Sequence, residues 1–181
     1  MTLDLLSDTE YPVHACGSLD RFLGDCERLP VQRSQIYGLR QIARQEPSKV
    51  HDFASHQRER AGRKQETASE RGRLGLQAEI DFWSLVNQLC TSTADSWSVR
   101  RTGLEYAPPD LQEENIPAKS ECRTNADRTR RSQLRKRQKE WLDGWTEKHI
   151  PAFFERFCTH ALYRLEVPAN DHQEGIHDNN R

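Results

Sequence analysis

The sequence predicts an all-α protein, a bundle of about five helices formed by a single domain over residues 1–166. Three observations favour this class. Apolar residues recur at three- and four-residue spacing, and no alternating run persists. Gln, Glu, Arg, Leu and Ala dominate the ordered-looking stretches, and β-branched residues are sparse. With 34% hydrophobic and 30% charged residues, we expect a small core and some segments that order only against a partner.

The N-terminal part is expected to contain one weak helix and one strong helix. Residues 1–17 are expected to be irregular, and residues 18–29 to form a short acidic helix. An amphipathic helix is expected over residues 32–46, because its apolar side chains share about a third of the helix circumference. These side chains are Ile36, Leu39, Ile42 and Ala43. Pro47 ends this helix and suits the first turn of the next one.

Two further helices are expected in the middle of the chain. The first runs over residues 47–71 and ends before Gly72 and Gly75, which indicate a turn. The second, over residues 76–90, is apolar on two opposite faces. A helix of that kind normally packs between others, so we expect it to be the central element of the bundle.

Residues 91–122 are expected to form a long loop, because they contain Thr-Ser-Thr, three prolines and several acidic residues. A short strand over residues 97–106 is the alternative. Long loops in compact domains are either functional or disordered.

The C-terminal part is expected to contain two helices and a tail. A basic helix begins near Asn125 or Asp127 and continues to about Trp145, with Gly144 near its end. A second helix over residues 151–165 buries a wide apolar arc. Residues 167–181 are rich in Pro, Asn, Asp, His and Gly, so we expect a disordered tail.

Basic residues are concentrated in two segments, although the net charge is only −1. Residues 28–73 contain 11 basic and 5 acidic residues, and residues 123–139 contain 8 basic and 1 acidic. The segments around them are acidic. Separation of basic and acidic segments along a chain is typical of a protein that binds a polyanion on one side and a different partner on the other.

On the expected helices these bases lie beside the apolar faces. The candidate nucleic-acid-binding residues are Arg33, Arg40, Arg44, Lys49, Arg60, Arg63, Arg128, Arg131, Arg135, Lys136 and Lys139. Arginine suits bidentate contacts with phosphate. No zinc-finger, RNP, GXXG or recognition-helix pattern occurs, so contact with phosphates without reading of bases is expected.

The alternative is that each basic row is a solvated helix face with ion pairs four residues apart. Glu59 and Arg63 favour this alternative in the helix over residues 47–71. It fits residues 123–139 poorly, because only one acidic residue accompanies eight bases there. That cluster would repel itself unless a polyanion or an acidic neighbour offset it.

Enzyme and metal signatures do not emerge from the sequence. No P-loop, dinucleotide-binding, HExxH or GxSxG pattern occurs, so we expect a non-catalytic protein without a cofactor or metal. The alternative is a zinc enzyme that uses Cys158 and His160 with other C-terminal histidines, namely His149, His172 and His177. Cys158 falls on the apolar face of its helix, where a thiol is poorly exposed for either role.

The cellular compartment is inferred from the cysteines and from the apolar runs. The five cysteines are odd in number, irregularly spaced and without a CxxC pair, which indicates reduced thiols in the cytoplasm. No signal peptide is apparent at the N-terminus. No apolar run is long enough to span a bilayer, so no membrane partner is expected.

Two stretches of the chain resemble a known family. Ser34-Gln-Ile-Tyr-Gly-Leu-Arg40, continuing to Arg60, and Gln138-Lys-Glu-Trp-Leu-Asp-Gly-Trp145, followed by Ile150 to Phe157, are similar to the small helical accessory subunits of type III CRISPR effector complexes. The resemblance covers roughly a third of the chain, and the acidic segment 91–122 departs from the family pattern.

This resemblance implies a non-catalytic subunit of a ribonucleoprotein complex in antiviral defence. Such a subunit docks on RNA-binding protein subunits and contacts guide RNA paired with target RNA, or a displaced single strand, through phosphates. The alternative function is a protein-interaction adaptor that docks its basic helices on acidic partner surfaces and has no direct role with nucleic acid.

Overall fold

A computed structural model of the chain describes residues 11–24, 29–92 and 98–166, and within these ranges the protein is all-α, with no strand. The α-helices are α2 (Tyr11–Leu23), α3 (Arg33–Gln45), α4 (Val50–Thr67), α5 (Glu70–Thr91), α6 (Val99–Glu105) and α7 (Asn125–Glu166). Short 3-10 turns are η2 (Pro47–Lys49), η3 (Pro109–Leu111), η4 (Glu113–Asn115) and η5 (Lys119–Glu121). The predicted all-α class is confirmed, whereas the predicted tail over 167–181 lies outside the described residues.

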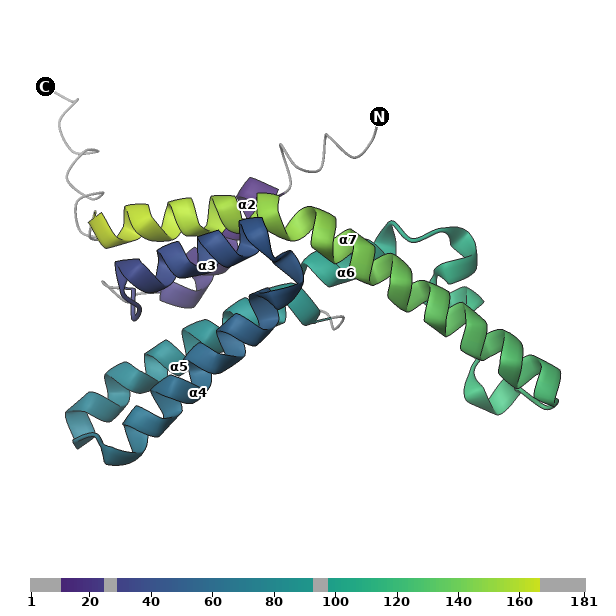
Figure 1. The fold of residues 1–181 in the computed structure, drawn as a ribbon, viewed down its shortest axis with the longest axis horizontal. Helices are drawn as coiled ribbons and strands as arrows, with labels where there is room; N and C mark the ends of the chain where they lie inside the picture. The colour runs from purple at the N-terminus through teal and green to yellow at the C-terminus, as the bar shows by residue number, and fades with distance from the viewer. Residues whose placement is uncertain (1–10, 25–28, 93–97, 167–181) are drawn as a thin grey trace, which may run out of the picture.

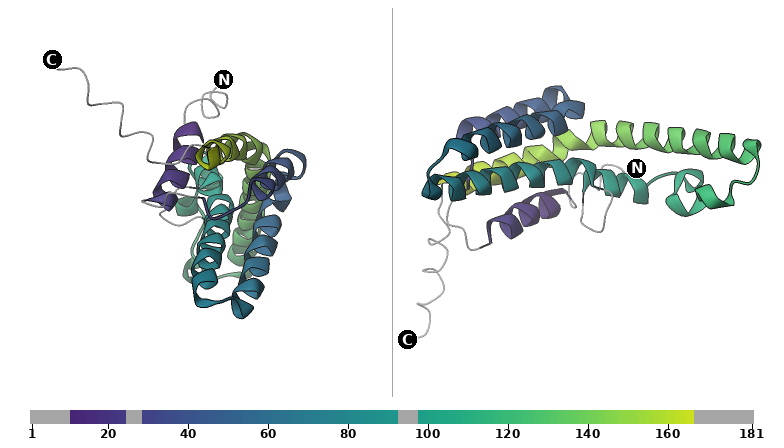
Figure 2. Two further views of the ribbon diagram at one scale, coloured as in Figure 1. Left: turned by 90° about the vertical axis from the view of Figure 1, so that its left-hand side faces the viewer. Right: turned by 90° about the horizontal axis from the view of Figure 1, so that it is seen from below.

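Helix α7 is the long axis of the molecule, and the other helices are arranged around it (Figure 1). Helices α2 and α3 pack against its C-terminal half, and α6 packs against it further toward the N-terminus. Helices α4 and α5 pair with each other and project from the body as a hairpin. The N-terminal half of α7 projects in another direction, so two arms leave one body (Figures 1 and 2).

The two helices predicted over residues 125–145 and 151–165 are one continuous helix, which corrects the sequence-based expectation. The helix begins with a reciprocal cap: the Thr124 amide donates to Asp127 Oδ2 (2.8 Å), and the Asp127 amide donates to Thr124 Oγ1 (3.1 Å). Pro151 lies inside this helix, where a proline costs about 3 kcal/mol. Burial of neighbouring side chains such as Ile150 and Phe153 offsets that cost. Figure 1 shows that α7 changes direction near its middle, as helices do at proline.

The predicted break at Gly72 and Gly75 is also wrong, because both glycines lie inside α5. The chain turns earlier, at Ala68 and Ser69, whose backbones are extended. A glycine inside a helix costs only about 1 kcal/mol, which pairing of α4 with α5 readily offsets. Ser69, a favoured helix-starting residue followed by Glu70, was the available signal for the true turn.

The first helix lies earlier in the chain than predicted. Residues 11–17 were expected to be irregular, but they form the first half of α2. The helix was expected to reach residue 29, and it ends at Leu23. Gly24 follows it with φ 49°, a left-handed conformation that glycine adopts without strain.

Residues 91–122 are not one loop. Thr91 still belongs to α5, and residues 99–105 form α6 in place of the alternative strand over 97–106. The Ser98 hydroxyl begins α6 by accepting a hydrogen bond from the Arg101 amide (3.0 Å). Three 3-10 turns follow, so the Pro-containing part has local order of its own.

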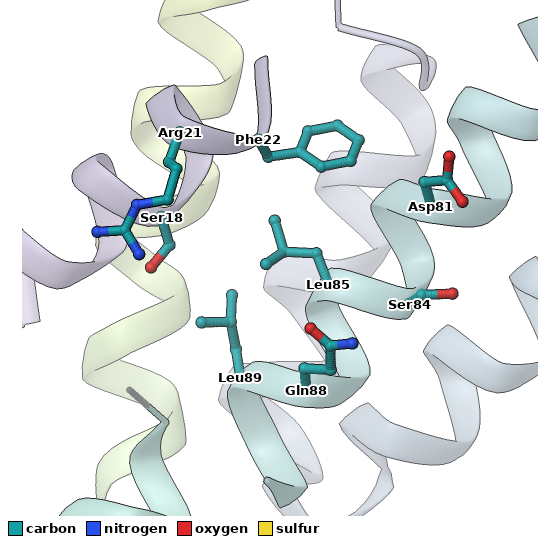
Figure 3. Close-up of a pocket in the computed structure, with 8 residues that line it drawn as sticks. All are labelled: Ser18, Arg21, Phe22, Asp81, Ser84, Leu85, Gln88 and Leu89. Atoms are coloured by element: carbon teal, nitrogen blue, oxygen red, sulfur yellow. The ribbon is translucent and has the colours of Figure 1, made fainter. Parts of the chain in front are cut away.

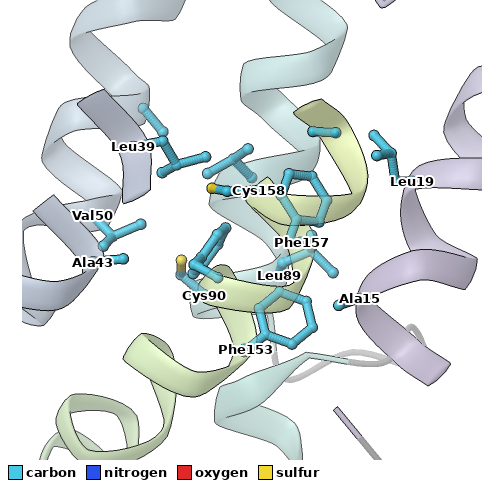
Figure 4. Packing of buried hydrophobic residues seen from close by; sticks show 14 of the residues in the cluster. Ala15, Leu19, Leu39, Ala43, Val50, Leu89, Cys90, Phe153, Phe157 and Cys158 are labelled. Atoms are coloured by element: carbon cyan, nitrogen blue, oxygen red, sulfur yellow. The ribbon is translucent and has the colours of Figure 1, made fainter. Parts of the chain in front are cut away.

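The core lies where the C-terminal halves of α5 and α7 meet α2, α3 and α4 (Figure 4). Phe82 of α5 packs against Phe22 of α2 and Phe157 of α7, and Trp83 packs edge-on against Phe53 of α4. The C-terminal half of α5 therefore packs against three neighbours. The prediction that this helix is the central element is wrong, because the other helices are arranged around α7. Each fully buried side chain of this size contributes roughly 1.5–3 kcal/mol.

Two smaller findings concern the cysteines and the membrane. Cys16, Cys90, Cys122 and Cys158 are free thiols. Within the described ranges, no helix combines the length and the apolarity needed to cross a bilayer.

Candidate nucleic-acid interface

The predicted arginines of α3 are bonded to the C-terminal half of α7. Arg33 Nη2 donates to Glu166 Oε1 (2.8 Å). Arg40 binds both carboxylate oxygens of Glu155, with Nε 3.1 Å from Oε2, and Arg44 Nε donates to the same Oε2 (2.7 Å). The Arg40 hydrogen bond is the main reason that the pKa of Glu155 lies below its usual value. These ion pairs link α3 to α7, and because Arg40 and Arg44 share Glu155, two carboxylates face three arginines.

Lys49, directly before α4, also forms an ion pair, but with a residue close to it in sequence. It forms an ion pair with Glu46, three residues earlier, and the hydrogen bond raises the pKa of Lys49. Both side chains are exposed, so the pair is screened by solvent.

Residues 107–122, here called the acidic strap, pack along the N-terminal half of α7. Arg135 donates from both Nη atoms to the two carboxylate oxygens of Glu113 (2.5 Å each), and Arg137 pairs with Asp110 (2.9 Å). Arg131 Nε donates to the Pro117 carbonyl (2.9 Å). The acidic neighbour that the basic segment 123–139 requires is therefore present within the chain itself.

The acidic strap is held by packing as well as by charge. Leu111, Ile116 and Cys122 are buried. Gln138 of α7 is also buried, and its Nε2 donates to the Leu111 carbonyl (2.8 Å) while its Oε1 accepts from Arg135 (3.0 Å). The strap is thus a folded part of the arm, and Arg135 is committed to it.

A row of predicted bases on α7 remains exposed, here called the α7 row: Arg128, Lys136 and Lys139. Lys136 and Lys139 follow Arg128 by eight and eleven residues, spacings that return to one broad side of a helix. Arg128 and Lys139 form no ion pair with any described acidic residue. Lys136 reaches only Glu140, at 3.9 Å with both side chains exposed, which is a weak pair.

The second exposed group lies at the end of the α4–α5 hairpin, residues 58–73, here called the hairpin tip. Its six bases are Arg58, Arg60, Arg63, Lys64, Arg71 and Arg73. All six are exposed, and none forms an ion pair within the described part of the chain. Sequence reasoning found Arg60 and Arg63 but missed the other four bases. It ended the first helix at Arg71 and placed the turn at Gly72 and Gly75, so Arg71 and Arg73 were not recognised as part of a helical hairpin.

The alternative metal or thiol site does not assemble around its described members. Cys158 is buried, and burial raises its pKa to about 12. His160 bonds to Asp20 (2.8 Å), while His149 stacks on Trp145 with ring centroids 4.1 Å apart. Among residues 11–24, 29–92 and 98–166, no three His, Cys, Asp or Glu side chains are grouped to hold a metal ion. His172 and His177 lie outside these ranges.

A hollow of about 410 Å³ lies between α2 and α5 (Figure 3). Figure 3 shows Arg21 and Asp81 on opposite sides of an apolar centre that includes Phe22 and Leu85. The Ser84 hydroxyl in its wall donates to the Ile80 carbonyl (2.9 Å), as a helix-facing serine commonly does. None of the predicted nucleic-acid-binding residues lines this hollow.

Comparison with known proteins finds no matching family model, no matching curated protein and no matching solved structure. The candidate interface is therefore defined by the geometry of this chain. It consists of the α7 row and the hairpin tip, one on each projecting arm.

Proposed function

We propose that the protein is a non-catalytic, RNA-contacting structural subunit of a CRISPR ribonucleoprotein effector complex in antiviral defence. The observation that supports this function most directly is that both projecting arms carry exposed bases without strong ion pairs. The CRISPR assignment rests on the resemblance of residues 34–60 and 138–157 to small subunits of type III complexes. The protein would act in the cytoplasm beside other protein subunits.

The distribution of ion pairs decides which bases can bind phosphate. Arg40 and Arg135 are each engaged with a carboxylate, so a phosphate would have to displace an existing partner. Arg60 and Arg128 have no such competitor among the described acidic residues. Binding of phosphates by exposed bases releases counterions, and this supplies an affinity that does not depend on base sequence.

Charge reversal on the two arms tests the proposal. In one variant Arg128, Lys136 and Lys139 are changed to Glu, and in a second Arg60 and Arg63 are changed to Glu. Binding of labelled single-stranded and duplex RNA is measured by anisotropy at low salt. We expect each variant to lose at least about tenfold in affinity, since each removes two or three phosphate contacts.

The matched control reverses two exposed bases of the body, Arg21 of α2 and Arg156 in the C-terminal half of α7. Circular dichroism checks that every variant remains helical. If the arm variants bind RNA as tightly as the control does, the proposed interface is wrong.

The adaptor function remains the second candidate, because one observation favours it. Arg131, Arg135 and Arg137 already bind an acidic protein segment, the acidic strap. An adaptor would keep its protein partners after nuclease treatment of a pull-down, whereas partners held through RNA would be lost.

A further inference from the structure

Arg135 lies on the same side of α7 as two members of the α7 row. It follows Arg128 by seven residues and precedes Lys139 by four, so its direction from the helix axis is within about 40° of both. Along the axis it stands about 10 Å from Arg128 and about 6 Å from Lys139. Both of these neighbours are exposed and form no ion pair with a described acidic residue. By position, Arg135 therefore fills the gap between them.

One carboxylate, that of Glu113, occupies Arg135 in the free protein. Both Nη atoms of Arg135 donate to the two carboxylate oxygens, at 2.5 Å each. A guanidinium binds a phosphate with the same pair of parallel hydrogen bonds. The hydrogen bond from Arg135 is the main reason that the pKa of Glu113 lies below its usual value, so this carboxylate is charged at neutral pH. Glu113 thus stands where a phosphate would bind.

The Glu113 side chain can leave Arg135 without unfolding of the acidic strap. It is 63% exposed, and the Arg135 side chain is 34% exposed, so water reaches the pair. The backbone of the strap is held by other contacts, since Leu111 is buried and its carbonyl accepts from Gln138 Nε2 (2.8 Å). Gln138 Nε2 also donates to Glu113 Oε2, at 3.3 Å, which is the longer of its two bonds. Rotation of one exposed side chain is therefore enough to uncover Arg135.

A second ion pair between the strap and the helix provides a contrast. Arg137 pairs with Asp110 (2.9 Å), and both side chains are more than half exposed. Arg137 follows Arg128 by nine residues, which places it on the opposite side of α7. Opening this pair removes the same contact from the same strap but adds no base beside Arg128. The two pairs thus differ in the side of the helix on which they lie.

We propose that Arg135 is a further phosphate-binding residue of the α7 arm and that Glu113 is an internal competitor for it. A nucleic-acid phosphate displaces the Glu113 carboxylate and accepts both guanidinium hydrogen bonds. A polyanion that already contacts Arg128 and Lys139 presents this phosphate at high effective concentration, which favours the exchange. The inference deepens the proposed function and rests on it, since it names a further contact with the same ligand.

Substitutions matched in charge test the competition. Glu113→Gln removes the competing carboxylate, and Asp110→Asn is its control, because it removes one charge from the same strap on the opposite side of the helix. Glu113→Gln is then combined with Arg135→Gln or, as the second control, with Arg137→Gln. The probe is a labelled single-stranded RNA of mixed sequence, titrated by anisotropy over a range of about fourfold in salt. Hydrogen exchange across residues 109–122 checks that the strap stays folded.

We expect Glu113→Gln to bind the RNA about threefold more tightly than wild type at low salt. Its slope of log affinity against log salt should steepen by about 0.7–0.9, the contribution of one phosphate contact, while Asp110→Asn leaves the slope unchanged. Adding Arg135→Gln should remove both gains, because they depend on that guanidinium. Adding Arg137→Gln, which changes the net charge equally, should leave the steeper slope in place.

Three results would overturn the competition. Equal slopes in Glu113→Gln and Asp110→Asn would mean that net charge alone matters. A steeper slope that survives Arg135→Gln would place the contact elsewhere. Faster hydrogen exchange across residues 109–122 in Glu113→Gln would mean that the whole strap leaves.

Failure of this inference is distinguishable from failure of the proposed function. If charge reversal of the α7 row abolishes RNA binding but Glu113→Gln changes nothing, the competition is wrong and the proposed function stands. If Glu113→Gln gains affinity for polyglutamate and not for RNA, the partner is an acidic protein and the phosphate site is wrong. If neither wild type nor Glu113→Gln binds RNA, both proposals fail.

Discussion

Gly103 and Gly144 show how much the surroundings of a residue matter inside a helix. Both lie in helices that pack against each other, α6 and α7. A Cβ at Gly103 would come 2.8 Å from Cδ1 of Trp145, whereas one at Gly144 would meet nothing. The same Gly→Ala change therefore has opposite consequences at the two sites.

We predict that Gly103→Ala lowers the free energy of unfolding by about 1–3 kcal/mol, because the indole of Trp145 must shift in a packed interface. Gly144→Ala should raise it by up to about 1 kcal/mol through helix propensity. Urea denaturation of both variants measures the difference. Equal changes in the two variants would show that α6 does not pack against Trp145 as described.

The Glu155 carboxylate predicts a pH dependence of stability. Its pKa is lowered on folding, first by the hydrogen bond from Arg40 and then by that from Arg44. A carboxyl with a lowered folded pKa stabilises the fold fully above its unfolded pKa, about 4.3, and this contribution is lost as the pH falls through the folded pKa. Because Glu155 is about one third exposed, we expect Glu155→Gln to cost no more than about 1 kcal/mol at pH 7.

The difference between wild type and Glu155→Gln should shrink as the pH falls below about 4. Thermal denaturation from pH 7 to pH 3 measures it. Glu147→Gln is the control, because Glu147 is exposed and forms no ion pair with a described residue. A difference that stays constant down to pH 3 would contradict the assigned ion pairs.

At the scale of elements, the acidic strap depends on one buried amide. Gln138 satisfies the Leu111 carbonyl and also accepts from Arg135. An acceptor left without its donor in a buried site costs about 1–3 kcal/mol.

We predict that Gln138→Leu lowers the free energy of unfolding by about 1–3 kcal/mol. It should also raise the rate of amide hydrogen exchange across residues 109–122. Gln133→Leu is a matched control, since Gln133 lies on the exposed face of the same helix. Hydrogen exchange followed by mass spectrometry distinguishes the two variants. Unchanged exchange in Gln138→Leu would show that the strap is held by its apolar contacts alone.

Helix continuity is the element-scale feature that sequence reasoning missed most often. Gly72 and Gly75 in α5, and Gly144 and Pro151 in α7, all suggested ends that the structure does not have. Local propensity disfavours helix at each of these positions by about 1–3 kcal/mol. Packing of whole helix faces outweighs that cost, and this contribution comes from residues distant in sequence.

At the scale of the molecule, the exposed bases predict the salt dependence of RNA binding. Changing Arg128, Lys136 and Lys139 to Ala should reduce the slope of log affinity against log salt by about 2–3, since each phosphate contact contributes about 0.7–0.9. Arg44→Gln should leave the slope unchanged, because Arg44 is bonded to Glu155. Anisotropy titrations between 50 and 200 mM salt, a range of about fourfold, measure these slopes. A smaller slope in Arg44→Gln would mean that RNA displaces Glu155.

The candidate interface was only partly predictable. The two basic segments were evident from composition, and Arg60 and Arg128 remain available on the arms. Arg40 and Arg135 were predicted alongside them, yet their partners lie 115 and 22 residues away in sequence. No local pattern shows such a pairing, because it forms only when distant helices pack.

The sequence by itself determined the all-α class, the approximate position of α3, α4, α5 and the two halves of α7, and the sorting of charge into basic and acidic segments. Helical periodicity and composition are properties of a few neighbouring residues, so they can be read locally. The tertiary structure decided that α7 is unbroken and which arginines are paired with carboxylates. These features depend on contacts between distant segments, whose free energies exceed the local preferences.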